Sequence, residues 1–260
     1  VPQWVRGEES LEILEPVPNK VPLLGLGGSV GTREEGVAGE LLVVKSFDDL
    51  TARASEARGR IVLFNVPYTN YGETVRYRSG GASAAAKVGA VAALVRAVGP
   101  PGLRTPHTGG MSYQKDLPKI PTAAIPTEDA DRFDRMAKRG QKVTLRLRMN
   151  ARFMDDAPSA NLVGEIRGSE KPDEVVLVGG HFDSWDPGTG AMDDGGGCVV
   201  TWEALRLLKT LGLTPKRTIR VVLFTNEENG LAGGNGYRDA HKAELEKHVL
   251  ALESDSGVFR

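Results

Sequence analysis

The chain lacks the features that would mark a disulfide-stapled, nucleic-acid-binding or membrane-surface protein. It has a single cysteine, Cys198, among 260 residues, which excludes an internal disulfide. Its formal net charge is -1 at pH 7, so it has no basic field of the kind that attracts nucleic acid or an anionic membrane. It also contains no Asn-x-Ser/Thr glycosylation site, and its first residues do not resemble a signal peptide.

No apolar run is long enough to predict a membrane span. The most apolar stretch, GASAAAKVGAVAALVRAVG, is built mainly of alanine and is interrupted by Lys87 and Arg96. Hydrophobic residues nevertheless make up 40% of the chain, so it can bury a core. Its length suits one large domain or two ordinary ones.

The second half predicts a doubly wound α/β fold with a mainly parallel sheet. Apolar strand patterns alternate there with helical ones, and alternation of this kind is typical of strand–helix–strand repeats. EVVLVGG is a continuous apolar run, as expected for a strand buried on both faces. The predicted strands cover 161–168, 174–180, 218–225 and 248–256, and the predicted helices cover 197–212 and 236–247.

The first half predicts a smaller, separate α/β unit. Strand patterns cover 60–67 and 142–150, and a helix with Thr127 as its N-cap covers 127–140. We therefore expect an inserted unit over 19–140, between a first segment (1–18) and the remainder (141–260). GLGGSVGT at 25–32 predicts a turn, because its third glycine is one residue late for a dinucleotide-binding loop. Tyr68, Tyr71 and Tyr77 would either anchor a loop or form an aromatic wall over a site.

Polar side chains follow three of the predicted strands at the point where each ends. His181 and Asp183 follow strand 174–180, Glu227 and Glu228 follow strand 218–225, and Glu253 and Asp255 lie at the end of strand 248–256. Asp193 and Asp194 lie between strand 174–180 and its helix. Because ligands bind beyond the carboxyl ends of parallel strands, the joint pattern predicts one site at this edge.

These groups are chemically suited to hold a cation. Carboxylates a few ångströms apart raise each other's pKa, and a divalent metal removes that repulsion. A histidine nitrogen with carboxylate oxygens suits zinc, whereas an all-oxygen set would suit magnesium or calcium. In the His-x-Asp spacing, Asp183 could orient the metal ligand His181. Gly195 to Gly197 would let the backbone approach the metal.

Four motifs in this order resemble the co-catalytic zinc peptidases of the M28 family: HFDSW, AMDDGGG, TNEENG and ESDSG. WVRGEES, SEARGRIV, AAAKVGA and WEALRLLKTLGLTPKRT extend the resemblance over nearly the whole chain. The inserted unit resembles a protease-associated (PA) domain. The resemblance implies that His181 and Asp255 ligate one zinc, that Glu228 ligates a second, and that Asp193 bridges the two.

The resemblance also implies the remaining roles. Glu227 is the general base, Asp183 is the outer-shell partner of His181, and Asp193–Asp194 is a cis peptide. The implied reaction is hydrolysis of small peptides, with dipeptides favoured. Two zincs about 3.5–4 Å apart share a water and polarise the scissile carbonyl. Glu227 takes the proton of the water and returns it to the departing amine.

One family ligand has no counterpart before Arg260. The family's second zinc needs a histidine further along the chain, and His107, His241 and His248 are poor substitutes by their predicted positions. We therefore expect a fragment of a complete enzyme that holds at most one zinc firmly and hydrolyses poorly. The alternatives are a non-catalytic binding protein on the same fold and a metal-dependent deacylase of non-peptide amides.

The remaining expectations concern partners and nearby residues. The resemblance implies a homodimer and a secreted or lysosomal location, and the composition predicts neither a nucleic-acid partner nor a membrane span. Asp186, beside Pro187 and Gly188, is expected to be a turn residue. Cys198, at the start of a buried helix, is expected to pack and not to ligate.

Overall fold

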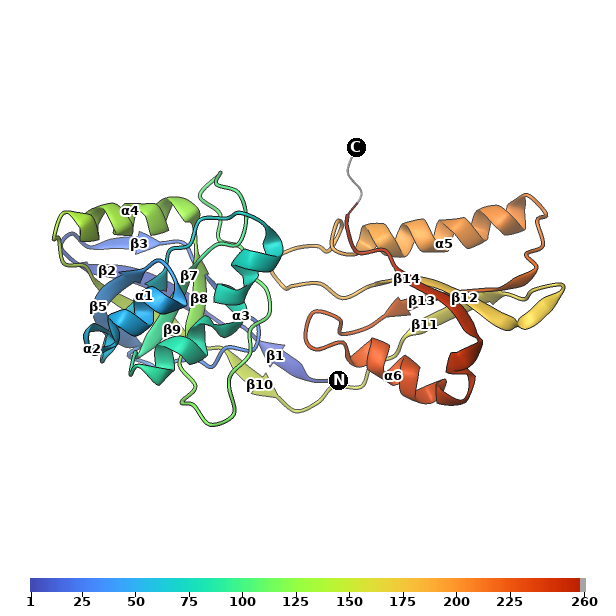
Figure 1. Cartoon of the computed structure of the whole chain (residues 1–260), viewed down its shortest axis with the longest axis horizontal. Coiled ribbons are helices and arrows are strands. Elements are labelled where there is room, and N and C mark those ends of the chain that lie inside the picture. The colour runs from blue at the N-terminus through green and yellow to red at the C-terminus, as the bar shows by residue number, and fades with distance from the viewer. Residues whose placement is uncertain (258–260) are drawn as a thin grey trace. The chain divides into compact units, whose positions relative to one another are not determined.

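The computed structural model describes residues 1–257 and divides into two compact units (Figure 1). Trp4–Met154 form one, called here the insert unit, and Val1–Gln3 with the residues from Asp155 onward form the other, called the site unit. The insert unit is wider at both ends than the 19–140 expected from the sequence. The reason is strand pairing: β2 (Glu9–Glu15) and β9 (Thr144–Met149) are antiparallel neighbours in its main sheet.

The insert unit is built on an eight-stranded mixed sheet with the order β3-β2-β9-β5-β6-β7-β8-β4. Its central strands β5 to β8 are parallel, and β9 and β4 join them antiparallel. A separate two-stranded ladder pairs β1 with β10. The elements not yet located are β1 (Gln3–Val5), β3 (Asn19–Val21), β4 (Leu24–Gly25), β5 (Val37–Val44), β6 (Ile61–Phe64), β7 (Ala92–Arg96), β8 (Thr122–Ile125) and β10 (Arg152–Met154).

Helices cover both faces of this sheet. One core packs Ala130 and Phe133 of α4 (Thr127–Lys138) against the strands. The other core packs the small residues of α3 (Tyr71–Lys87) together with α1 (Phe47–Ala52) and α2 (Ala54–Ala57). Glycine, alanine and serine fill the second half of α3, where the helix lies close to the sheet. At Gly81, a Cβ would lie 3.1 Å from the Phe64 ring.

Two details of the insert unit differ from the sequence expectation. The α3 helix starts at Tyr71, so Tyr71 and Tyr77 are helical and not in a loop. Tyr77 packs on Phe47 with ring centroids 4.6 Å apart, which makes it an anchor within this unit's own core. Thr127 is the first residue of α4, and its N-cap is Pro126.

The site unit contains a four-stranded sheet with the order β11-β13-β12-β14. The strands β12, β13 and β14 are parallel, and β11 pairs antiparallel with β13. The mainly parallel sheet expected from the sequence is therefore present, with one antiparallel edge strand. The bounds are β11 (Leu162–Ile166), β12 (Lys171–His181), β13 (Arg217–Phe224) and β14 (His248–Glu253).

The crossovers place helices on both faces of the site-unit sheet. The chain moves one way from β12 to β13 through α5 (Gly195–Thr210) and the opposite way from β13 to β14 through α6 (Ala232–Ala240). Right-handed crossovers in opposite directions put the two helices on opposite faces, and Figure 1 shows this arrangement. The expected helix 236–247 is split, because a 3-10 helix, η1 (Lys242–Lys247), follows α6. No helix among the described residues is long and apolar enough to cross a membrane.

Candidate metal site

The site is built around the buried last residue of β12, His181. The strand carries the imidazole into the edge where the parallel strands end, and the residue is 0% exposed. Its Nδ1 lies 3.0 Å from the carbonyl oxygen of Asp183. Its Nε2 faces carboxylates, at 3.1 Å from Asp193 Oδ1 and 3.6 Å from Asp255 Oδ1. Glu227 Oε2 is 3.9 Å from the same nitrogen.

The buried Nε2 of His181 fits a metal better than it fits a protein partner. It makes no hydrogen bond within the described residues, although a buried polar atom without a partner costs free energy. Three carboxylates from three segments lie around it, and a neutral imidazole with carboxylates is a donor set suited to zinc. The residues present therefore fit the metal that the sequence suggested.

Asp183 links His181, at the end of β12, to the Glu227–Glu228 segment that follows β13. One of its oxygens accepts the N–H of Glu227 at 2.9 Å, and the other accepts the N–H of Glu228 at 3.2 Å. Burial raises the pKa of Asp183, but the bonds to His181 and to these N–H groups outweigh it and hold the pKa below its usual range. An ionised Asp183 thus fixes both the histidine and the Glu227–Glu228 segment, a connection that His-x-Asp spacing alone does not reveal.

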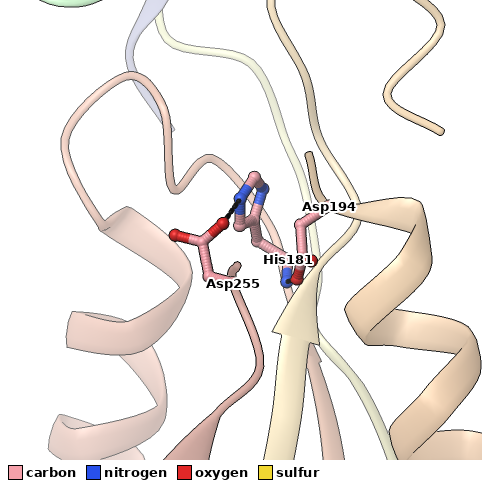
Figure 2. A group of neighbouring side chains, drawn as sticks. All are labelled: His181, Asp194 and Asp255. Atoms are coloured by element: carbon pink, nitrogen blue, oxygen red, sulfur yellow. Dashed lines mark hydrogen bonds and ion pairs between the residues drawn. The ribbon is translucent and has the colours of Figure 1, made fainter. Parts of the chain in front are cut away.

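Asp194 is occupied by backbone donors. It is 0% exposed and is the N-cap of α5, accepting the N–H of Gly197 at 3.1 Å. Its other oxygen accepts the N–H of His181 at 3.0 Å. Figure 2 shows Asp194 beside the backbone of His181, while Asp255 points at the imidazole ring. The peptide between Asp193 and Asp194 is cis, as the resemblance implied.

Two ligand sets are possible around His181, and they differ in whether Asp193 or Asp194 binds the metal. Ligand atoms of His181, Asp194 and Asp255 all lie within 4.8 Å of one another. Asp193 is not in that group, yet it has the carboxylate oxygen nearest to Nε2 and a 67% exposed side chain. Because both Asp194 oxygens already accept backbone N–H groups, we favour Asp193 as the freer ligand.

Burial and like charges shift the pKa values of the acids at the end of β13. Burial raises the pKa of Glu228 to about 7, and the charges of Asp193 and Glu227 add to the effect. The pKa of Glu227 is also raised, first by burial and then by the charges of Asp255 and other acids. Asn226 turns the chain into this segment with a left-handed φ of 57°, a conformation that asparagine tolerates better than most residues.

The glycines at the start of α5 allow packing of the protein on itself. A Cβ on Gly197 would collide with the carbonyl oxygen of Ser254 and the carboxylate of Asp194. A Cβ on Gly180 would lie 2.5 Å from Asp194 Oδ2. From the sequence we expected these glycines to leave room for a metal. The contacts show instead that they leave room for neighbouring protein atoms. They allow α5 to lie against the ends of β12 and β14.

Gly197→Ala is expected to destabilise the protein by about 1–3 kcal/mol, because the added methyl group forces a shift of backbone and of Asp194. Gly236→Ala is the matched control, since a Cβ there meets nothing within 4 Å on α6. The control is expected to be stabilising by about 0.5–1 kcal/mol. Urea unfolding of both variants measures the difference, and equal stabilities would contradict the packing argument.

The other residues singled out from the sequence lie in different surroundings. His248 bonds to the hydroxyl of Tyr237 at 2.9 Å, and His241 lies 2.6 Å from a carboxylate oxygen of Glu244. Both belong to a cluster around α6 and η1. The Sγ of Cys198 is buried and donates to the carbonyl of His181 at 3.1 Å. Asp186 lies in a turn in which the Gly188 N–H donates to Trp185 O at 3.0 Å.

The chain is similar to known proteins of one peptidase family. Residues 161–259 match the family model described as peptidase family M28. The predicted resemblance to this family is confirmed. Carboxypeptidase Q from Xenopus laevis is 54% identical over 259 residues, which are 100% of this chain and 55% of that protein. The chain therefore spans about half the length of the curated relatives it matches.

Solved structures confirm the α/β fold class. The crystal structure of a peptidase M28 precursor from Shewanella amazonensis SB2B superposes with a TM-score of 0.94 at 40% identity, covering 99% of this chain and 60% of that one. The zinc aminopeptidase BSAP from Bacillus subtilis superposes with a TM-score of 0.66 at 25% identity, covering 98% of this chain and 58% of that one.

Proposed function

We propose that the chain carries the metal-binding and base-bearing part of a zinc exopeptidase that hydrolyses small peptides, dipeptides in particular. The observation that carries the proposal is the buried Nε2 of His181, which has no hydrogen-bond partner in the described chain and faces carboxylates from three segments. Matches to a zinc aminopeptidase and to carboxypeptidase Q support the reaction class.

The proposed residue roles are those that the resemblance to the M28 family implies. His181, Asp193 and Asp255 would hold one zinc, and Glu228 with Asp193 would hold a second. Bound zinc would supply a Lewis acid that polarises the scissile carbonyl and lowers the pKa of water. Glu227 would accept a proton from water and deliver it to the leaving amine.

Metal removal combined with a dipeptide panel tests this function. In the full-length protein, free dipeptides are expected to be cleaved, chelator treatment is expected to abolish the activity, and zinc is expected to restore it. Amino-blocked and carboxyl-amidated dipeptides in the same panel show which end the site requires. Cleavage that survives complete zinc removal, or zinc-loaded protein without hydrolysis of any free dipeptide, would contradict the proposal. The second result would favour a binding protein.

Zinc binding is expected to release at least one proton near neutral pH and to strengthen as pH rises. In the metal-free site, burial lowers the pKa of His181. The hydrogen bond to Asp183 and the charge of Glu227 raise it by more than burial lowers it, so the pKa is about 10. The protonated ring therefore stabilises the metal-free fold below its ordinary pKa of 6.5, and this contribution is lost as pH rises through about 10. Calorimetry in buffers of different ionisation enthalpy counts the protons; binding without proton release would contradict the assignment.

We extend the proposal to the rest of the chain. The insert unit would be a domain of the protease-associated type, which its separate cores and mixed sheet support. A homodimer and a secreted or lysosomal location stay predictions from the resemblance, and sedimentation and cell fractionation test them.

A further inference from the structure

We propose that Asn161 is a positioning residue for hydrolysis, because its side chain joins the two ends of the loop that carries Glu227 and Glu228. This loop, called here the Glu227 loop, covers 226–231, between β13 and α6. The inference rests on the proposed function, since it concerns how the proposed base and a proposed zinc ligand are held. Asn161 lies outside the proposed ligand set and would act through the loop.

Asn161 reaches this part of the sheet because the edge strand β11 is antiparallel. It directly precedes β11, and Leu162 of that strand pairs with Leu223, close to the end of β13. The last residue of β13, Phe224, pairs in turn with His181 at the end of β12. The start of β11 therefore lies at the edge of the sheet where the parallel strands end.

The side-chain amide of Asn161 bridges the residues on either side of the Glu227 loop. Its Oδ1 accepts the N–H of Thr225 at 3.1 Å, and its Nδ2 donates to the carbonyl oxygen of Gly233 at 2.8 Å. A backbone N–H can only donate and a carbonyl oxygen can only accept, so this is the one orientation of the amide that satisfies both partners. We call these three residues the Asn161 junction.

The Asn161 junction is closely packed as well as hydrogen-bonded. The N–H of Gly233 donates to Thr225 O at 2.9 Å, so these two residues are joined both directly and through Asn161. A Cβ on Gly233 would collide with Thr225 O and lie 2.5 Å from Asn161 Oδ1. The hydroxyl oxygens of Ser159 and Thr225 are 2.7 Å apart, which adds a second side-chain bond from the segment before β11.

These bonds restrain the backbone that carries Glu227. The N–H of Glu227 donates to Asp183 Oδ1 at 2.9 Å, and its carbonyl oxygen accepts the N–H of Leu231 at 3.0 Å. Asp183 thus holds the loop from the β12 side, and Asn161 holds its two ends from the β11 side. A general base acts only within hydrogen-bond reach of the proton it takes. A displacement of about 1 Å can cost about 100-fold in rate, so the junction supports turnover.

Hydrogen exchange of the metal-free chain tests the junction without relying on catalysis. Asn161→Asp keeps the oxygen that accepts from Thr225 and removes the N–H that donates to Gly233. Amide exchange within 225–233 is expected to be at least about 10-fold faster, because a lost hydrogen bond favours local opening. Exchange in β12 is expected to be unchanged. Asn235→Asp, at an exposed position on α6, is the matched control and is expected to exchange as the wild type does.

Kinetics of the full-length protein test the effect on the reaction. At saturating zinc, Asn161→Asp is expected to lower kcat per bound zinc by about 10- to 100-fold, because the base is displaced. KM is expected to change little, since the groups that bind the substrate are left in place. A role confined to folding would lower the free energy of unfolding and the amount of active protein, and would not lower kcat per zinc-loaded molecule.

A second pair of variants leaves Asn161 itself intact. Gly233→Ala is expected to push Asn161 Oδ1 away from the junction, and so to speed exchange in the Glu227 loop and lower kcat. Gly234→Ala is the matched control, because a Cβ at the next position of α6 meets nothing within 4 Å. If Asn161→Asp does not fold, wild-type loop exchange in Gly233→Ala would overturn the inference.

The outcomes separate this inference from the proposed function. Wild-type kcat in Asn161→Asp, or exchange that is equally faster in the loop and in β12, would overturn the positioning role and leave the proposed function standing. Absence of zinc-dependent dipeptide hydrolysis by the full-length wild-type protein would overturn the proposed function and, with it, the catalytic purpose of the junction.

Discussion

In the full-length protein, Glu227→Gln is expected to lower kcat for dipeptide hydrolysis by about 10²- to 10⁴-fold, the usual contribution of a positioned general base. Glutamine keeps the shape of glutamate and cannot take a proton from water. Glu227 is outside the proposed ligand set, so zinc content is expected to be unchanged. Steady-state kinetics and metal analysis on the same sample measure both quantities.

Glu253→Gln is the control for this experiment. Glu253 is an acid at the end of β14, and burial raises its pKa as it does that of Glu227. No role in proton transfer or metal binding is assigned to it, so its amide is expected to have little effect on kcat. Near-normal turnover in Glu227→Gln, or an equal loss in both variants, would remove Glu227 from the role of base.

His181→Ala is expected to abolish binding of the zinc that His181 would hold, and hydrolysis with it. The substitution removes the only nitrogen among the proposed ligands and leaves the surrounding carboxylates without their neutral partner. The loss of affinity should exceed the roughly 10- to 100-fold that follows removal of an outer-shell partner. Isothermal titration with zinc measures it, and circular dichroism checks that the fold persists.

His241→Ala is the matched histidine control in the same unit. Its ring stacks on Tyr237 and bonds to Glu244, in a cluster separate from His181. Zinc affinity is expected to be unaffected in this variant. Retention of zinc by His181→Ala would show that the metal binds elsewhere.

The site-unit fold could be predicted from the sequence because its pattern is local. EVVLVGG and TIRVVLFT are continuous apolar runs that form buried parallel strands, and the leucine spacing after Gly197 predicts α5. The direction of β11 could not be predicted in this way. A strand of five residues has the same composition whether it pairs parallel or antiparallel, so its direction depends on the partner strand.

The insert-unit boundaries depended on long-range pairing that no local pattern reports. Glu9–Glu15 pairs with Thr144–Met149, more than 100 residues away along the chain, so the unit extends beyond the expected range 19–140. The start of α3 at Tyr71 was missed for a different reason. Its N-cap, Asn70, was hidden in a stretch whose tyrosines suggested a loop.

Much of the site arrangement followed from the rule that parallel strands end at one edge. The structure brings Asp193, Asp255 and Glu227 around His181 Nε2, as that rule predicts. The contacts that hold these residues in place could not be predicted from that rule. The packing of Gly197 against Ser254 depends on the three-dimensional path of the chain, and so do the bonds from Asp183 to the Glu227–Glu228 segment.

The most direct test is a zinc-edge anomalous difference map from crystals of the zinc-loaded protein. The account predicts a peak about 2.0–2.1 Å from His181 Nε2, with carboxylate oxygens of Asp193 and Asp255 completing that side. A zinc peak elsewhere, with none beside His181, would contradict it.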